Sequence, residues 1–462
     1  MIGERLLGEF EAVVGKENAW TDPEDLHTYS YDAAVVDPSR PGIVLRPTTP
    51  EMLGRLVSLC NANGVPMTVR GSGTNLSGGT VPHPGGAVVV TNGLDSIIEI
   101  NEADMYAVVQ PGVVTARLAA AVEAKGLFYP PDPGSQAVST IGGNVAENAG
   151  GLRGLKYGVT RDYVSGLHFF DVEGNLVKTG SRTVKCATGY NLTGLMVGSE
   201  GTLGVFAEII LKLIPYPRHR KAMMAVFDGL DQASETVAAV IAGRIVPATL
   251  EFMDNFTIRA VEDFSHVGLP VDAAAMLLVE LDGHPAQVEE DAQQVQDICR
   301  SMGATSVRVA EDAAERDRVW EARRSALSAL AKLKPTLVLE DATVPRSRIP
   351  DMVRAIQDIG RRYDLQIGTF GHAGDGNLHP TILTDKRNTD EWRRVESAID
   401  DIFEEALQMG GTLSGEHGTG TAKSRYLEKE TSSGTILLSS RMKRALDPNN
   451  ILNPGKIIGV GN

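Results

Sequence analysis

The stretch VRGSGTNLSGG, residues 69–79, leaves a short apolar strand and turns into a run of glycine and small polar residues. Glycine lets backbone N–H groups turn toward an anion, and the Ser and Thr hydroxyls add donors. The stretch is not the dinucleotide fingerprint G-x-G-x-x-G, because Leu76 stands where the third glycine belongs. The stretch GTGTAKS at 418–424 also fails as a P-loop, because Ala422 precedes the lysine. On its own, 69–79 is either an anion-binding loop of another kind or a flexible surface turn.

Two more glycine-rich stretches follow in the same half of the chain. STIGGNVAENAGG at 139–151, preceded by PPDPGS at 130–135, forms the second, and GSEGTLGV at 198–205 forms the third. Three such loops within one domain suit an extended, diphosphate-bearing ligand better than chance loop composition.

Composition limits the classes of function that remain. A chain of 462 residues exceeds what a single core supports, so we expect two domains or more. The net charge of −15 argues against a nucleic-acid partner. Cys60, Cys186 and Cys299 are far apart, which favours neither disulfides nor an iron–sulfur cluster and fits a reducing, cytoplasmic setting. Because no stretch gives the ~18 uncharged apolar residues of a spanning helix, we expect a soluble protein, peripheral to a membrane at most.

The pattern of glycine and apolar residues changes near Tyr216. Residues 41–215, after an N-terminal arm at 1–40, show short strands and dense glycine. From residue 216 to about 425, amphipathic helical patterns near 231–242, 286–302, 311–331, 348–362 and 390–409 alternate with apolar strands, which predicts a second, α+β domain. The last segment, 426–462, contains LDPNNILNPGK, whose Asp-Pro and Asn-Pro steps fix turns, and we expect it to dock back on the first domain.

Three of the nine histidines fall in two glycine-framed motifs, GHAGDGNLH at 371–379 and SGEHGTG at 414–420. His372, His379 and Glu416 would offer two imidazoles and a carboxylate, a set that suits a divalent metal with coordination positions left for substrate. The alternative from spacing alone is that these polar residues satisfy the backbone of tight turns.

Taken together, these motifs resemble the FAD-linked oxidases of the vanillyl-alcohol-oxidase or PCMH fold, within the group of glycolate oxidase large subunits and D-lactate dehydrogenases. The similarity covers about residues 40–458. It implies an α+β protein with a two-subdomain PCMH-type FAD-binding domain at 41–215. It also implies a cap domain at 216–425 with a ferredoxin-like antiparallel sheet, and a C-terminal segment at 426–462 that returns to the FAD domain.

The resemblance also implies the residues that bind FAD. Binding is expected to be non-covalent, because the first loop carries Thr74 and Asn75 where other members attach the flavin through histidine or cysteine. The residues implied are Arg70, Gly71, Ser72, Gly73, Thr74, Asn75, Ser77, Gly78, Pro131, Asp132, Gly134, Ser135, Ser139, Thr140, Gly142, Gly143, Asn144, Asn148, Gly151, Glu200, Gly204, Val205, Asn377 and Asn453.

By the same resemblance, His372, His379 and Glu416 bind Zn²⁺, with Mn or Fe as alternatives, and His417 acts as the base. The segment VWEARR at 319–324 resembles the family's Trp-x-x-Arg motif, which gives Arg323 the substrate carboxylate by bidentate pairing. A solvated arginine on a helix is the competing interpretation.

The implied reaction is oxidation of a small D-2-hydroxy acid, D-lactate or glycolate, to the 2-oxo acid with hydride transfer to flavin N5. Relatives that take 2-hydroxyglutarate have a lysine near Leu339 and an asparagine near Thr381. This chain lacks both residues, so D-2-hydroxyglutarate is only the runner-up substrate. Two different functions on the same fold stay open, a redox-neutral FAD enzyme and a structural flavoprotein subunit.

Since the chain has neither a nicotinamide fingerprint nor iron–sulfur spacing, electrons must pass to an external acceptor: a quinone, an iron–sulfur subunit or an electron-transfer flavoprotein. Such a partner could hold the protein at the inner membrane, and a homodimer stays open.

Overall fold

The computed structural model describes residues 2–459, so Met1 of the N-terminal arm and the last three residues of the C-terminal segment lie outside it. The chain forms two compact units. The first comprises 1–149, 159–216 and 416–462, and the second comprises 150–158 and 217–415. The expected boundaries were 215/216 and 425/426.

The first unit contains two sheets, each with its own core. The smaller sheet has the strand order β1 (Ala19–Trp20), β2 (Ile43–Leu45), β4 (Ala87–Val90) and β3 (Met67–Arg70), with β2 and β3 parallel to β4. Helix α3 (Pro50–Ala62) links β2 to β3, and it begins where the Thr49 side chain accepts a hydrogen bond from Met52 N, with Pro50 in the first turn. Helix α1 (Glu4–Val14) packs on α3.

The larger sheet of this unit is antiparallel, in the order β5 (Ile97–Asn101), β6 (Tyr106–Val109), β10 (Val205–Lys212), β8 (Val164–Phe170) and β9 (Leu176–Gly180). Its core includes residues of α4 (Thr115–Glu123) and α5 (Ile141–Glu147). The unit is completed by α2 (Pro23–Thr28), α7 (Leu192–Met196), α15 (Leu427–Glu430), α16 (Ser433–Leu446) and the strand pair β7 (Leu127–Phe128) and β11 (Ile214–Pro215).

The C-terminal segment packs into the first unit through buried polar contacts. Leu452 bridges Met67 of β3 in parallel. Lys443 Nζ donates to Thr202 O, Leu452 O and Asp447 Oδ2 at 2.9, 2.7 and 2.5 Å. Because a buried ammonium is tolerated only when it is paired and hydrogen-bonded, these contacts fix the course of the segment after α16.

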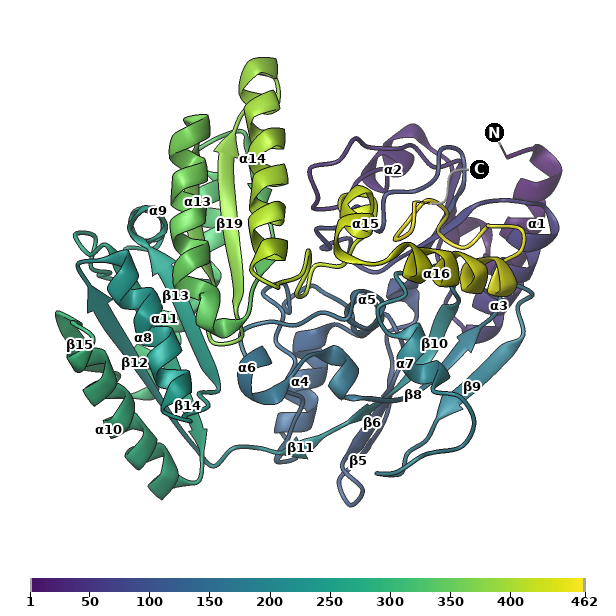
Figure 1. Ribbon diagram of the computed structural model, residues 1–462. Helices are drawn as coiled ribbons and strands as arrows, with labels where there is room; N and C mark the ends of the chain where they lie inside the picture. Colours follow the sequence, from purple (N-terminus) through teal and green to yellow (C-terminus); the bar gives the residue numbers. More distant parts are fainter. Residues whose placement is uncertain (1, 460–462) are drawn as a thin grey trace. The chain divides into compact units, whose positions relative to one another are not determined.

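The second unit is built on an antiparallel sheet in the order β15 (Ser306–Val309), β12 (His219–Phe227), β14 (Ala275–Gly283), β13 (Thr249–Asp254), β18 (Gln366–His372), β19 (Asn377–Thr384) and β16 (Thr336–Leu339), with β17 (Ala342–Thr343) also on β19. Its helices are α6 (Gly154–Tyr157), α8 (Leu230–Ala242), α9 (Asn255–Ser265), α10 (Pro285–Ser301), α11 (Ala313–Arg324), α12 (Ala326–Ala331), α13 (Ile349–Tyr363) and α14 (Thr389–Gln408). Figure 1 shows α13 and α14 side by side across β19.

The expected α+β fold class, with an antiparallel cap sheet and a returning C-terminal segment, is confirmed. One element differs: the helix expected at 311–331 is two helices, α11 and α12, which meet at Ser325. The Ser325 hydroxyl donates to Ala322 O at 2.7 Å, a local side-chain bond that competes with a continuous helix.

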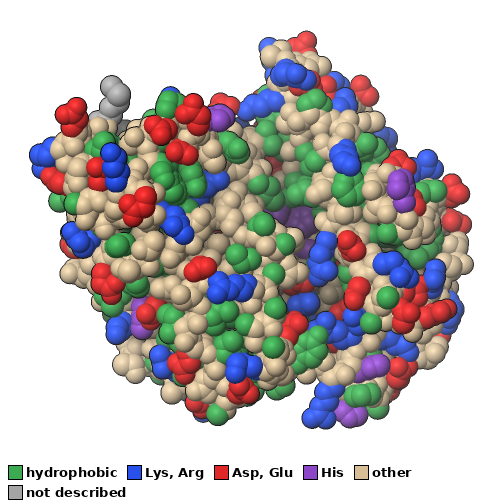
Figure 2. All heavy atoms as spheres, turned by 180° about the vertical axis from the view of Figure 1, so that it is seen from behind, with side chains coloured by type: hydrophobic (Ala, Val, Ile, Leu, Met, Phe, Trp, Pro, Cys, Tyr) green, Lys and Arg blue, Asp and Glu red, His purple; other side chains and the backbone are tan. Residues whose placement is uncertain are grey.

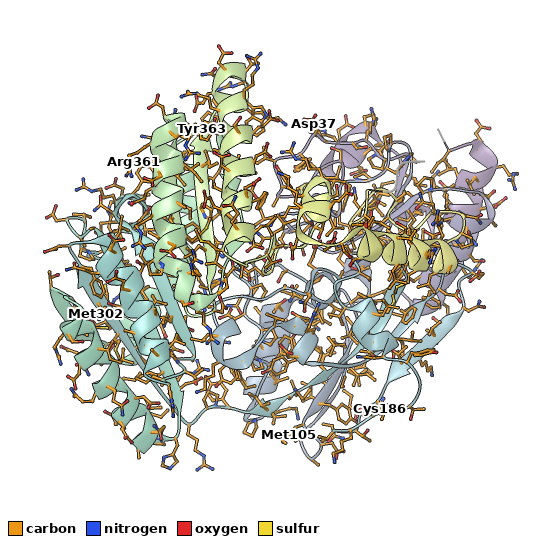
Figure 3. The ribbon with its side chains drawn as sticks, viewed as in Figure 1. Asp37, Met105, Cys186, Met302, Arg361 and Tyr363 are labelled. Atoms are coloured by element: carbon orange, nitrogen blue, oxygen red, sulfur yellow. The ribbon has the colours of Figure 1, made fainter. Side chains whose placement is uncertain are left out.

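The described surface carries charged side chains of both signs and the exposed Cys186. Figure 2 shows acidic and basic side chains interspersed over the visible face rather than gathered into one basic patch. Figure 3 shows Cys186 in the loop that follows β9, where its side chain is exposed. Within residues 2–459, no helix has both the length and the apolar character needed to cross a membrane.

Candidate functional site

The first glycine-rich loop leaves β3 at Arg70 and turns sharply at two glycines. Gly73 and Gly78 have φ of +70° and +73°, in the left-handed region that favours glycine. A Cβ on Gly71 would overlap the hydroxyl of Thr140. The first loop therefore packs directly on the start of the second.

Several residues expected to bind the cofactor hold this loop in shape. Arg70 is buried, and its Nη1 donates to Tyr31 O at 2.6 Å and to Thr80 Oγ1 at 3.3 Å. Asn75 donates to Asp32 Oδ2 at 2.7 Å, and burial raises the pKa of Asp32. Arg70 and Asn75 therefore hold the loop against neighbouring parts of the first unit.

The second and third loops meet along α5. Thr140 Oγ1 accepts from Gly143 N at 3.2 Å, and Asn144 Nδ2 donates to Thr115 Oγ1 at 2.8 Å. The third loop follows the far end of the helix, where the N–H groups of Gly198 and Glu200 donate to the carbonyls of Val145 and Ala146, both at 2.9 Å. The three loops found in the sequence therefore converge on one short helix.

The buried carboxylate of Glu200 holds the turn after the Glu416-His417 pair against the third loop, and the carboxylate of Glu147 binds the first loop. Glu200 accepts from Thr419 N and Gly420 N, both at 2.7 Å, and burial raises its pKa to about 7 against these donors. Glu147 accepts from Ser77 Oγ at 3.1 Å. Burial, together with the charge of Glu200, raises the pKa of Glu147 well above its usual range.

Asn453 of the C-terminal segment joins the first and third loops. Its Nδ2 donates to Gly79 O at 2.8 Å and to Glu200 O at 2.7 Å, and its Oδ1 accepts from Thr68. This residue, expected at the cofactor, is a buried clamp on two of the loops.

The converging loops fit an extended dinucleotide cofactor. A Cβ on Gly134 would meet no atom within 4 Å, and one on Gly143 would meet only the Thr140 hydroxyl, so both glycines border open space. Ser199 Oγ is buried without a hydrogen-bond partner among residues 2–459, which is unusual unless a ligand satisfies it. Glycines at the surface of a loop allow the close backbone approach that a pyrophosphate needs.

In the second unit, strand pairing gathers polar side chains on one face of the sheet. Met253 of β13 pairs with Phe370 of β18, and Phe370 pairs with His379 of β19. Since side chains alternate along a strand, Glu251, Met253, Phe370, His372 and His379 share that face. The hairpin between His372 and Asn377 requires Gly376, whose φ is +93° and whose Cβ would overlap Val344 O.

The two histidines are buried close together. His372 and His379 are 7% and 4% exposed, their ring centroids are 5.0 Å apart, and the rings are nearly perpendicular at 88°. One ring nitrogen of each lies within 4.8 Å of the other. This spacing suits two imidazoles that bind the same ion.

Asp341 lies beside this pair. Its carboxylate is fully buried, comes within 4.8 Å of a ring nitrogen of His379 and accepts from Ser414 Oγ at 2.7 Å. A Cβ on Gly415 would overlap Thr343 and Asn377, so the chain touches the hairpin before it leaves this unit. Glu416 and His417 are the next two residues and belong to the first unit, where His417 Nε2 is 3.7 Å from Glu416 Oε1.

Arg323 is buried on the same face of the sheet, and Glu251 is its ion-pair partner. Glu251 also accepts a hydrogen bond at 2.7 Å from His372 Nδ1. Burial raises the pKa of Glu251, but Arg323 and His372 outweigh it, and the net shift is downward. The Arg323 guanidinium stacks 4.7 Å above the Phe370 ring, and Arg323 Nε has no hydrogen-bond partner among the described residues.

The structure thus distributes the expected residues over two units. Most residues expected at FAD lie in the first unit, but Gly151 and Asn377 belong to the second, together with His372, His379 and Arg323. Sequence reasoning missed Glu251 and Asp341. The available signal was a carboxylate inside an apolar strand, as in TLEFMD at 249–254, or directly after one, as in TLVLED at 336–341.

Known proteins with similar sequences cover nearly the whole chain. Residues 41–180 match the FAD binding domain family, and residues 216–457 match the family of FAD linked oxidases, C-terminal domain. The chain is 50% identical to the glycolate oxidase subunit GlcD of Bacillus subtilis strain 168, with 99% of this chain and 97% of that protein covered. It is 34% identical to a D-lactate dehydrogenase of Anaerostipes hadrus, with 92% and 91% covered.

A solved structure shares the fold at low identity. The p-cresol methylhydroxylase structure with substrate bound superposes with a TM-score of 0.81 at 18% identity and covers 98% of this chain and 96% of that one. The sequence matches, the shared fold and the glycine loops around α5 agree with one another. This chain belongs to the FAD-linked oxidase family and is an FAD-binding oxidoreductase.

Proposed function

We propose that this protein oxidises a small D-2-hydroxy acid, D-lactate or glycolate, to the 2-oxo acid with FAD as the non-covalent hydride acceptor. The observation that carries the proposal is the second unit's sheet face, where two buried imidazoles and a buried arginine lie together. These groups match the substrate, which has a hydroxyl to deprotonate and a carboxylate to bind. The names of two relatives, glycolate oxidase subunit and D-lactate dehydrogenase, support the same chemistry.

Arg323 is proposed to bind the substrate carboxylate. Glu251 occupies one part of the guanidinium and Phe370 supports its face, while Nε stays without a partner among the described residues. An unsatisfied buried donor of a charged group costs about 1–3 kcal/mol or more. A bound carboxylate would remove that cost, and the stacked guanidinium is already oriented for it.

His372, His379 and Glu416 are proposed to hold a divalent metal, Zn²⁺ first, with Mn or Fe as alternatives. The two histidines present ring nitrogens within 4.8 Å of each other. Gly415 packs on Thr343 and on Asn377, which ends the hairpin that begins at His372. Glu416, the proposed third ligand, is the next residue along the chain. A metal bound there would act as a Lewis acid on the substrate hydroxyl.

His417 is proposed to accept the hydroxyl proton. An imidazole with a pKa near neutrality suits this step, and loss of the proton favours departure of hydride from Cα. FAD, when bound, supplies the hydride acceptor at N5. The residues of this chain therefore bind the carboxylate and take the proton.

A compact monocarboxylate is favoured over D-2-hydroxyglutarate, the runner-up substrate. Leu339 of β16 pairs directly with Thr381 of β19, and Thr381 shares its face of the sheet with His379 because the two are two residues apart. Both side chains are neutral. Neither offers a cation to a second carboxylate.

Reduced flavin is proposed to pass its electrons to an external acceptor, which would be a quinone, an iron–sulfur subunit or an electron-transfer flavoprotein. The sequence has no C-x-x-C spacing, so the chain lacks the usual cysteine pattern of an iron–sulfur cluster. The name of its 50% identical relative, a glycolate oxidase subunit, supports a multisubunit arrangement.

Anaerobic mixing of the FAD-loaded protein with D-lactate, L-lactate, glycolate and D-2-hydroxyglutarate tests the function directly. We expect D-lactate or glycolate to bleach the oxidised-flavin band, because hydride transfer reduces the flavin. Removal of metal with a chelator should abolish the bleaching, and Zn²⁺ should restore it. A protein that stays yellow with all four acids would favour a redox-neutral enzyme or a structural flavoprotein subunit.

Replacement of the proposed base, His417→Ala, should leave FAD bound but slow flavin reduction by about 10²–10⁴-fold, the usual contribution of a positioned base. Stopped-flow absorbance measures the rate, and FAD content is measured on the same sample. His83→Ala, at an exposed histidine of the first unit, is the matched control. Rapid reduction in the His417→Ala protein would remove His417 as the base.

Replacement of the carboxylate-binding arginine, Arg323→Lys, should raise KM by about 10–100-fold, because a charge-assisted hydrogen bond is worth about 1.5–3 kcal/mol. We expect a smaller change in kcat. Arg324→Lys changes the exposed neighbour and should leave both constants near wild type. Equal KM values for the two variants would contradict the assignment.

A further inference from the structure

Glu251 is a carboxylate in the middle of a buried strand. It lies in β13 between Leu250 and Phe252, and its exposure is 0%. Burial of an ionised carboxylate is costly unless it is paired and hydrogen-bonded. An apolar residue at this position of the strand would avoid that cost. The role of Glu251 is therefore to be sought in the groups that its carboxylate contacts.

Both described partners of Glu251 are donors that belong to the proposed site. His372 Nδ1 lies 2.7 Å from Oε1, and Arg323 forms an ion pair through Oε2. The strand register brings them together: Met253 pairs with Phe370 and Phe252 with Gly371, so Glu251 and His372 come next on the same face. One carboxylate thus connects the proposed metal ligand to the proposed carboxylate-binding arginine.

A hydrogen bond from Nδ1 decides which nitrogen of the imidazole is left to bind a ligand. With Glu251 accepting at Nδ1, the proton of neutral His372 resides there, and Nε2 presents its lone pair. Carboxylates commonly orient metal-binding histidines in this way and raise their basicity. The same carboxylate offsets the charge of Arg323 inside the protein.

We propose that Glu251 is a positioning residue that fixes His372 in the Nδ1–H tautomer, with Nε2 available to the metal, while it holds the Arg323 guanidinium in place. This role rests on the proposed function for the metal and for the substrate carboxylate. Glu251 itself touches neither.

The substitution Glu251→Gln is expected to change the tautomer of His372. A glutamine amide has one acceptor oxygen and one donor group, whereas His372 Nδ1–H and Arg323 both donate. The oxygen should face the charged guanidinium, because that hydrogen bond is the stronger one. The NH₂ group then faces Nδ1, which favours the Nε2–H tautomer and removes the lone pair from the metal position.

The first test is Zn²⁺ affinity of the FAD-loaded protein, measured by competition with a chromophoric chelator. Glu251→Gln should weaken binding about 10–100-fold, as loss of such orienting groups does elsewhere. The control is Glu280→Gln, another buried carboxylate of the same sheet, which accepts from Trp320 Nε1 at 2.8 Å. It should retain wild-type affinity.

The second test needs no metal. In protein labelled with ¹⁵N-histidine, the chemical shifts of His372, assigned through its loss in His372→Ala, report its tautomer. We expect Nδ1–H in the metal-free wild type and a shift to Nε2–H in Glu251→Gln. The double variant Glu251→Gln, Arg323→Met frees the amide oxygen for His372, so it should restore the Nδ1–H tautomer and recover most of the lost Zn²⁺ affinity.

The outcomes separate the two proposals. A wild type that binds no Zn²⁺ would contradict the metal site of the proposed function. A wild type that binds Zn²⁺ while Glu251→Gln binds it equally well, with the His372 tautomer unchanged, would overturn the role of Glu251 alone. A double variant as weak as the single one would also overturn it, because a merely structural defect would not be relieved by removal of Arg323.

Discussion

The alternation of side chains along β13, β18 and β19 is the constraint on which the rest of the second unit's site depends. A shift of one residue in the pairing of β13 with β18 would send Glu251 to the opposite face from His372. The observed register puts His372, His379, Glu251 and Phe370 on one buried face, and α11 adds Arg323 to it. Charged groups are tolerated on this face because each is paired or stacked.

In the proposed function, the two units divide the chemistry between them. The first carries glycine-rich loops around α5, and its glycines suit the close backbone approach of an anionic cofactor. The second uses strand side chains, whose positions are fixed by a sheet. The chain passes from one to the other directly after Ser414 and Gly415, which contact Asp341, Thr343 and Asn377. Glu416 and His417 follow at once, so the proposed third ligand and base are tethered to the histidine hairpin by the backbone itself.

Sequence alone predicted the second, α+β domain from the change to helical periodicity after Tyr216, and the glycine-rich motifs carried the family resemblance that implied the fold class and FAD. It assigned Arg70, Asn75 and Asn453 to the cofactor, and the structure adds that all three also hydrogen-bond within or between the loops or to residues beside them. Glu251 and Asp341 escaped prediction because their importance arises from cross-strand neighbours far away in sequence. The register that brings Glu251 to His372 joins residues 121 positions apart, and no local pattern encodes it.

The most direct measurement of this arrangement is anomalous diffraction at the zinc edge from crystals of the FAD-loaded protein grown with Zn²⁺ and the 2-oxo acid product. A single strong peak within bonding distance of Nε2 of His372 and of a ring nitrogen of His379, with the product carboxylate on Arg323, is the predicted result. A map with no peak at the two imidazoles, and with the product bound away from Arg323, would contradict the proposed site.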